Sequence, residues 1–237
     1  RANYVPNFID IKFDSLCISE NDIVKAINKK TVGMCIPNLV GNLPDWLVIK
    51  KIAKKYNLFL IEDSADTLGY KIKKKNTGKI SDIVITSYYG SHIVSCAGNG
   101  GSLSLNNKKL YEKSLLLRSW GRSSSLFKEN SEKIENRFNI RLDGIEYDKK
   151  FVFQELGFNY EPSEVGAAFG NIQLDKLKTN INIRKRNFKL HYNFFSKYEQ
   201  YFFLPSILDT VETAWLAYPV ILKSNMIYKL FLFIIQS

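Results

Sequence analysis

Three short apolar runs stand out in the first half of the chain. They are Thr31–Pro37 (TVGMCIP), Leu58–Ile61 (LFLI) and Asp82–Ser87 (DIVITS). Runs of this length, rich in β-branched residues and bounded by polar ones, are typical of buried strands. Between the first two, Asp45–Tyr56 carries apolar residues at near-helical spacing with lysines opposite, which predicts an amphipathic helix. We expect Gly101–Leu105 to be a further strand and Leu110–Trp120 a helix.

The order of these elements indicates the fold. Strands that are apolar throughout and alternate with helices predict a mainly parallel sheet covered on both faces, a three-layer α/β/α arrangement. Ligands of such sheets bind beyond the carboxyl ends of the strands. Asp63 follows the second strand and Ser87 ends the third. We therefore expect both side chains at the ligand-binding edge of the sheet.

The pattern changes after Gly121. A serine-rich and then charged stretch up to Lys150 is expected to be an excursion from the core. The patterns further on predict a helix with a small-residue face, a basic and aromatic helix, and a strand, over Pro162–Leu177, Asn180–Tyr198 and Thr213–Leu222. We predict a large domain over residues 1–179 and the start of a small α+β domain over residues 180–237.

A net charge of +11 raises nucleic acid as a partner. The placement of the lysines argues against it, because they lie on the outward face of the first predicted helix and in a predicted hairpin turn after Gly69. Runs of lysine are usually solvated surfaces. An anionic ligand such as a nucleoside diphosphate would also benefit from this charge. We expect no nucleic-acid partner.

Other classes of protein are disfavoured by simple counts. No apolar run reaches the length of about 18 residues that a membrane helix needs, and the apolar tail Met226–Ile235 is short and interrupted by Lys229. The three cysteines Cys17, Cys35 and Cys96 are scattered, with no zinc spacing and no disulfide framework. We expect a cytoplasmic protein without membrane contact. Because the chain opens on an arginine within an apparent strand entry, we expect it to be a piece of a longer one.

Two segments carry candidate chemistry. The first is IEDSADTLG (Ile61–Gly69) and the second is SYYGSHIVSCAGNGG (Ser87–Gly101). Taken singly, the first is a strand followed by a polar turn and the second a tight glycine loop. The GNGG run alone is a weak phosphate signal, and a lone histidine such as His92 is more often a packed or surface residue than a catalytic one.

Together, in this order and spacing, the two segments resemble the sugar aminotransferases of the DegT/StrS type, a family of fold type I pyridoxal-phosphate enzymes. The family has an IEDAAQ-like strand end and a segment like SFxxxKxxxxxGxGG, whose lysine binds the cofactor covalently. In this chain the lysine position is occupied by His92. Further matches are Pro37–Asp45, Trp120–Arg122 and Gly157–Leu177. The resemblance extends from Val5 to Pro219 and implies a fold type I enzyme truncated at both ends, whose large domain binds the cofactor.

The resemblance also implies roles for single residues. Asp63 would pair with the pyridinium nitrogen of the cofactor and keep it protonated. Asp66 stands where the family usually has glutamine, near the ring hydroxyl, and Ser87 would donate to the cofactor phosphate. Asn159 resembles the asparagine that reaches across a homodimer to the partner's phosphate. Two residues later the family often has arginine, but this chain has Glu161.

His92 is the informative departure. Imidazole cannot hold the cofactor covalently, so we expect it to be bound non-covalently, as pyridoxamine 5'-phosphate or pyridoxal 5'-phosphate. Histidine suits a general base at neutral pH. This resembles the sugar 3-dehydratase branch of the family, which acts on nucleotide-linked 4-keto-6-deoxyhexoses for deoxysugar and lipopolysaccharide biosynthesis and takes its amino group from a donor such as glutamate. One subgroup of this branch carries an iron–sulfur cluster, bound by cysteines that closely follow the WGR segment. In this chain that position is Ser123–Leu126 (SSSL), so we expect no iron–sulfur cluster and no metal.

Alternatives stay open at this point. The chain could belong to a sugar-nucleotide aminotransferase with a displaced base, or to a non-catalytic remnant that dimerises or binds. The companion change of glutamine to Asp66 resembles the dehydratase branch and favours a functional substitution at His92. The residues do not identify the nucleotide or the sugar.

Overall fold

The computed structural model describes residues 3–127, 133–138 and 140–223. The predicted apolar tail Met226–Ile235 lies outside the described residues. The chain divides into two compact units, one built from Arg1–Ser104 with Val165–Ser237 and the other from Leu105–Glu164. Each unit is described by itself below.

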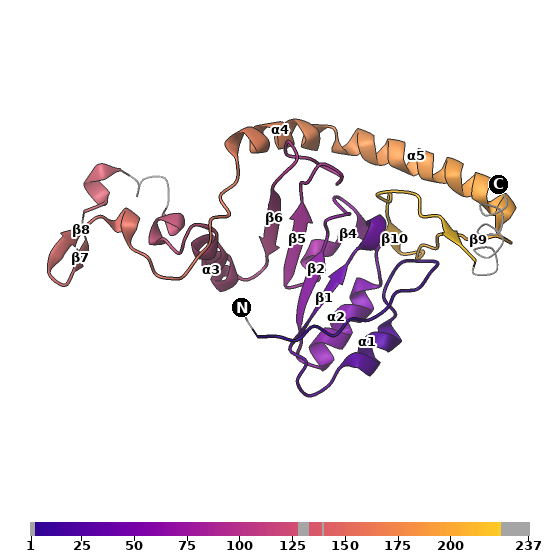
Figure 1. The fold of residues 1–237 in the computed structure, drawn as a ribbon, viewed down its shortest axis with the longest axis horizontal. Helices are drawn as coiled ribbons and strands as arrows, with labels where there is room; N and C mark the ends of the chain where they lie inside the picture. The colour runs from indigo at the N-terminus through magenta and orange to yellow at the C-terminus, as the bar shows by residue number, and fades with distance from the viewer. Residues whose placement is uncertain (1–2, 128–132, 139, 224–237) are drawn as a thin grey trace, which may run out of the picture. The chain divides into compact units, whose positions relative to one another are not determined.

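The first unit contains a four-stranded sheet in the order β1-β2-β5-β6 (Figure 1). Its strands are β1 (Gly33–Pro37), β2 (Phe59–Asp63), β5 (Ile83–Ser87) and β6 (Gly101–Leu105). Strands β1, β2 and β5 pair in parallel, which confirms the predicted mainly parallel α/β sheet. Parallel pairing brings the carboxyl ends of these three strands to one edge of the sheet, where Asp63 and Ser87 end β2 and β5.

Helix α2 (Trp46–Lys55) connects β1 to β2 and shows why the amphipathic pattern was informative. The Asp45 side chain caps it by accepting hydrogen bonds from the backbone N–H groups of Leu47 and Val48, both at 3.0 Å. Trp46 and Ile49 are fully buried in the main core. Burial of each such side chain contributes about 1.5–3 kcal/mol. The shorter helix α1 (Glu20–Ala26) adds Ile23 to the same core.

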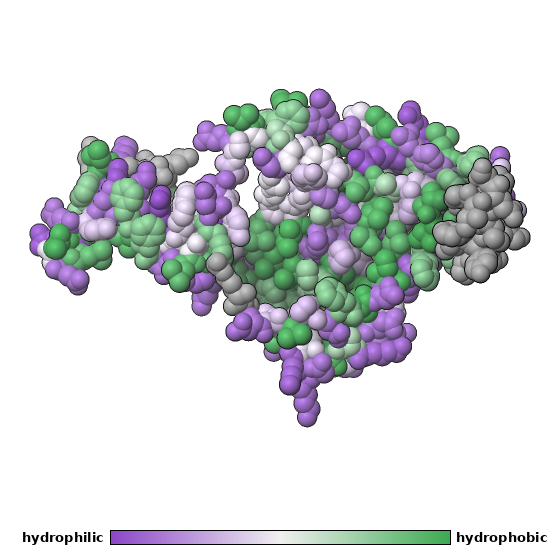
Figure 2. Space-filling view, viewed as in Figure 1, coloured by the Kyte–Doolittle hydropathy of each residue, from purple (hydrophilic) through white to green (hydrophobic). Residues whose placement is uncertain are grey.

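The two faces of the sheet differ in their coverage. Leu60 and Glu62 of β2 are fully buried, whereas Phe59 on the opposite face is 37% exposed and Ile85 of β5 is 39% exposed. Figure 2 shows hydrophobic residues gathered over the strands in the middle of the view. Apolar strand residues alone do not reveal which face of a sheet is more covered, and in the described residues the face that carries Phe59 and Ile85 is the less covered one. Asp63 and Ser87 alternate onto the less covered face.

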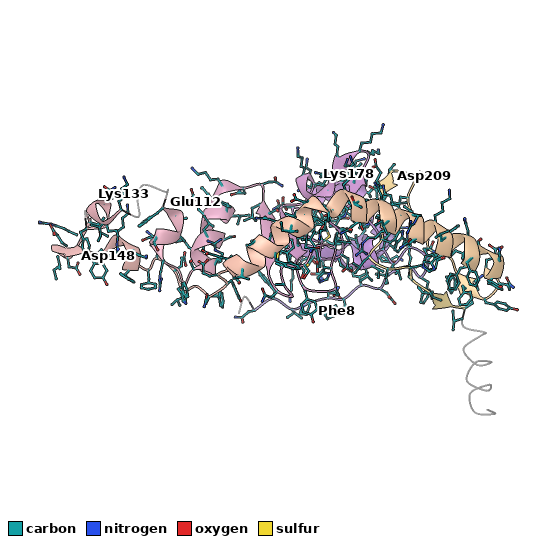
Figure 3. All side chains as sticks on the ribbon, turned by 90° about the horizontal axis from the view of Figure 1, so that it is seen from above. Phe8, Glu112, Lys133, Asp148, Lys178 and Asp209 are labelled. Atoms are coloured by element: carbon teal, nitrogen blue, oxygen red, sulfur yellow. The ribbon has the colours of Figure 1, made fainter. Side chains whose placement is uncertain are left out.

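The remaining elements of the first unit surround this sheet. The helices are α4 (Glu164–Asp175), α5 (Leu177–Phe195), η1 (Leu39–Gly41), η2 (Thr77–Lys79) and η7 (Ser196–Tyr198). The short strands are β3 (Lys71–Ile72), β4 (Lys75–Asn76), β9 (Phe202–Phe203), β10 (Val211–Glu212) and β11 (Ile221–Leu222). Figure 3 shows α4 and α5 from above, with Lys178 labelled near the start of α5. The two predicted helices and the predicted hairpin turn in this region are confirmed.

One predicted element is wrong. Thr213–Leu222 was expected to be a strand, but only its last two residues pair, as β11. Trp215 adopts a left-handed φ of 52° and stacks on Phe188 of α5, with the ring centroids 5.2 Å apart. The apolar side chains of this segment pack against the core and α5 instead of lining one face of a sheet.

The second unit is smaller. Its elements are α3 (Lys108–Arg118), η3 (Ser123–Leu126), η5 (Ile134–Asn136), β7 (Ile140–Leu142), β8 (Ile145–Tyr147) and η6 (Lys149–Phe151). The backbones of Gly121 and Gly157 approach so closely that a Cβ atom on Gly157 would overlap the Gly121 nitrogen. The WGR and GFN motifs, residues 120–122 and 157–159, therefore pack directly against each other.

Two further expectations concern organisation. The predicted boundary between residues 179 and 180 stays a prediction, and helix α5 runs through it. No described helix is both long enough and apolar enough to cross a membrane.

Candidate active site

The ends of β2 and β5 place two candidate site residues at the same sheet edge. Among the described residues, the one side-chain hydrogen bond of Asp63 is accepted by Oδ1 from the Ala65 N–H, at 3.0 Å. The Ser87 Oγ accepts from the Tyr89 N–H at 3.2 Å, which leaves its own hydrogen free to donate. This edge therefore offers a carboxylate acceptor and a hydroxyl donor, both from strand ends.

The residue before Asp63 has a different role, which sequence reasoning missed. Glu62 is fully buried on the covered face of the sheet. Its carboxylate accepts hydrogen bonds from Asn38 Nδ2 (2.9 Å), Ser64 Oγ (2.7 Å), Ser81 Oγ (3.0 Å) and Thr77 Oγ1. Buried carboxylates need such partners. The two adjacent acids therefore have different roles. Glu62 is held by hydrogen bonds on the covered face of the sheet, and Asp63 lies on the less covered face.

Asn38 extends this network into the turn after β1. Its Nδ2 donates to Glu62 as above and its Oδ1 accepts from the Trp46 indole N–H at 2.8 Å. Asn38 is 1% exposed and Trp46 is fully buried. A polar residue directly after a buried strand was the available signal, but the sequence does not reveal its partners.

Asp66 and His92 come together from the two motif segments. The distance between Asp66 Oδ1 and His92 Nδ1 is 3.1 Å, and each side chain is 19% exposed. The second carboxylate oxygen, Oδ2, accepts from the Val40 N–H at 2.9 Å. The His92 backbone N–H donates to the Tyr89 carbonyl at 3.1 Å, and the Tyr89 ring meets the imidazole edge-on. The structure thus brings together two of the predicted site residues in direct contact.

The turn that carries Val40 is itself held by a distant segment. Val40 and Gly41 both have left-handed φ values, 54° and 87°. The Leu216 N–H donates to the Val40 carbonyl at 2.8 Å, and the Thr213 hydroxyl donates to the Gly41 carbonyl. We call residues 213–216 the clamp segment. It fixes the backbone N–H that in turn holds Asp66.

The loop between β5 and β6 carries His92 and is tied at its base. The Tyr88 N–H donates to the Gly100 carbonyl, and the Cys96 N–H donates to the Tyr88 carbonyl, both at 3.0 Å. Helix α4 packs on this loop so tightly that a Cβ atom on Gly170 would overlap the Cys96 sulfur. The small-residue face predicted for this helix therefore serves the loop that presents His92.

Asn159 lies in the second unit, in a bridge to Ser119. Glu161, which departs from the family pattern, accepts from the Ser119 hydroxyl and lies 3.6 Å from the Arg118 Nε. The predicted contact of Asn159 with a cofactor phosphate stays a prediction. His191, the second histidine, is exposed on α5 beside Tyr218. Among the described residues, no group of three or more His, Cys, Asp or Glu side chains is arranged to hold a metal ion.

Comparison with known proteins shows the family to which this chain belongs. The model of the DegT/DnrJ/EryC1/StrS aminotransferase family matches residues 1–232. The chain belongs to this family. The sheet, the strand-end residues Asp63 and Ser87, and the loop that carries His92 all lie within the matched residues.

The relatives include enzymes of two reaction types. The lipopolysaccharide biosynthesis protein RfbH of Salmonella typhimurium is 28% identical over 93% of this chain and 51% of its own length. The UDP-4-amino-4,6-dideoxy-N-acetyl-beta-L-altrosamine transaminase of Campylobacter jejuni is 32% identical over 91% of this chain and 52% of its own. The Escherichia coli GDP-4-keto-6-deoxy-D-mannose-3-dehydratase, solved with bound hydrated PLP, superposes with a TM-score of 0.75 at 26% identity, covering 92% of this chain and 54% of its own. The chain spans about half the length of these relatives.

Proposed function

We propose that the chain is part of a pyridoxamine-phosphate-dependent 3-dehydratase of a nucleotide-linked 4-keto-6-deoxyhexose. The observation that carries the proposal is His92, which stands in place of a covalent lysine and is held by Asp66 at 3.1 Å. In a decayed site, we would not expect the replacement side chain to be oriented by a carboxylate, as His92 is by Asp66. The dehydratases among the relatives support the same assignment.

The residues at the sheet edge fit this cofactor. Asp63 has a carboxylate oxygen available to accept from a protonated ring nitrogen, and Ser87 has a hydroxyl hydrogen available for a phosphate oxygen. Both side chains lie on the less covered face of the sheet. When bound, the cofactor supplies an electron sink for chemistry at the adjacent sugar carbon.

His92 is the proposed general base. It would take a proton from the cofactor methylene and pass a proton to the departing C3 hydroxyl, and general acid–base groups contribute about 10²–10⁴-fold. Because imidazole forms no covalent link to the cofactor, the cofactor is bound reversibly. The C3 hydroxyl would leave as water with electrons supplied by the amino cofactor, and hydrolysis would release ammonia, the 3-deoxy-4-keto sugar and the aldehyde form of the cofactor. An amino donor such as glutamate would then restore the amino form. We propose a homodimer, with Asn159 directed to the partner's cofactor phosphate, and a cytoplasmic site of action without an iron–sulfur cluster.

The test uses the full-length protein with pyridoxamine phosphate, glutamate and candidate 4-keto sugar nucleotides, with product masses as the readout. The proposal predicts a sugar product lighter by one oxygen atom together with release of ammonia, whereas replacement of the 4-keto oxygen by an amino group would show an aminotransferase. His92→Asn should keep cofactor binding and lose about 10²–10⁴-fold in turnover. His191→Asn is the matched control and should leave turnover unchanged, because this histidine is exposed on α5. Unchanged dehydration in His92→Asn would overturn the assignment of the base.

Restoring the family residue gives a second test. His92→Lys should bind pyridoxal phosphate covalently, visible as a yellow absorption that borohydride traps as a mass increase. Dehydration should fall in the same variant, since the base has been replaced by a covalent anchor. A His92→Lys protein that dehydrates as fast as the wild type would contradict the proposal.

A further inference from the structure

We propose that Asp66 is a positioning residue that keeps the proton of neutral His92 on Nδ1 and so leaves Nε2 as the basic nitrogen. This inference rests on the proposed role of His92 as the base. It differs from the role that the resemblance implies for Asp66, a contact with the ring hydroxyl of the cofactor.

The chemistry of the contact determines the tautomer. An ionised carboxylate can only accept hydrogen bonds, and a neutral imidazole has one donor and one acceptor nitrogen. With Asp66 Oδ1 at 3.1 Å from His92 Nδ1, the favourable arrangement has the hydrogen on Nδ1. The lone pair of Nε2 is then free. The hydrogen bond of one ring nitrogen thus selects the state of the other.

The carboxylate is itself fixed. Its Oδ2 accepts from the Val40 N–H at 2.9 Å, and that N–H belongs to the turn held by the clamp segment. Asp66 is therefore held by a backbone donor on one side while it orients the imidazole on the other. At 19% exposure, water competes little for the pair. This arrangement needs neither substrate nor cofactor, so it can be tested in the free chain.

The chain offers a clean measurement because it contains two histidines, His92 and His191. Nitrogen-15 NMR of the 237-residue chain, at a pH where both rings are neutral, reports which ring nitrogen carries the hydrogen. A His191→Asn variant assigns the two signals. We expect His92 to be protonated on Nδ1. A wild-type His92 protonated mainly on Nε2 would overturn the inference.

The decisive variant is Asp66→Asn. Its amide oxygen can still accept from the Val40 N–H, while its NH₂ group now points a donor at His92 Nδ1. The hydrogen should therefore move to Nε2, with the His191 signals unchanged. An unmoved His92 tautomer in a folded Asp66→Asn chain would overturn the inference. If Asp66→Asn does not fold, Asp66→Ala serves instead, because without a partner His92 should populate both tautomers, and a single unchanged tautomer refutes the proposal.

The full-length protein separates this inference from the proposed function. Asp66→Asn should lower dehydration by about 10²–10⁴-fold, as expected for a disabled general base, while Asp66→Glu, which keeps the carboxylate, should recover part of it. A tautomer that switches in a protein whose wild type shows no dehydration would overturn the proposed function and leave the positioning role standing. If the wild type dehydrates and Asp66→Asn shows normal dehydration with an unchanged His92 tautomer, the positioning role is overturned and the proposed function stands.

Discussion

Gly41→Ala tests whether the clamp segment holds the active-site turn. Gly41 has a φ of 87°, and a Cβ atom there would lie 2.5 Å from the Leu216 nitrogen and 2.9 Å from the Trp215 Cα. A left-handed conformation costs a residue with a Cβ about 1–2 kcal/mol. Overpacking adds about 1–3 kcal/mol, and here the crowded atoms belong to backbone that cannot rotate away. We therefore expect a loss of about 2–5 kcal/mol in the free energy of unfolding.

The matched control is Gly98→Ala. Gly98 has a φ of 92° in the same unit, but a Cβ atom there would meet nothing within 4 Å. It should lose only about 1–2 kcal/mol. Urea denaturation of both variants gives the difference, and heat denaturation should show about 2–4 °C lower Tm for each kcal/mol. Equal destabilisation of the two variants would refute the clamp. In Gly41→Ala we also expect the amide hydrogen of Val40 to exchange faster.

Four further predictions concern other parts of the first unit. Glu62→Gln should cost about 1–3 kcal/mol in urea denaturation, because an amide NH₂ would face the donors that now surround the carboxylate; a neutral effect would contradict the network. Asp45→Ala should cost about 0.5–2 kcal/mol by removing the cap of α2, and a change of less than that in the same assay would show that the cap contributes little. Desolvation and the Asp63 carboxylate raise the pKa of the exposed Cys35 thiol, so its labelling by a disulfide reagent should accelerate as the pH rises above 8 and should be faster at pH 8 in Asp63→Asn. Burial raises the pKa of Cys17 to about 12, so this thiol should react only on unfolding, and rapid labelling of Cys17 in the folded chain would contradict its placement.

Much of the sheet was predictable because its signals are local. β1, β2 and β5 follow from short apolar runs, and α2 from the spacing of its apolar residues and the cap at Asp45. The failure at residues 213–222 has a physical cause. An apolar run can pack against a helix as well as it can pair in a sheet. The sequence does not show that Trp215 of this run stacks on Phe188. Which face of the sheet is less covered could not be predicted either, since burial depends on partners as well as on the strand itself.

The candidate site was predictable only in part. Asp63, Ser87 and His92 could be selected from motif spacing, and the edge of the sheet where two of them end follows from parallel topology. The contact of His92 with Asp66 could not be found, because it depends on a loop conformation. Glu62 and Asp63 are adjacent acids that the sequence cannot distinguish until strand alternation and the buried donors around Glu62 are known.

The clamp segment has a consequence for how the protein is made. The Thr213 hydroxyl reaches the Gly41 carbonyl across 172 positions of sequence. Ribosomes add about 5–20 residues per second, so the clamp segment is synthesised about 9–34 s after the turn that it holds. After β5 has been made, the parallel strands can pair while Val40 still lacks its partner from Leu216. A chain truncated between β6 and residue 213 therefore has all four strands of the sheet but lacks the segment that holds the turn beside Asp66 and His92.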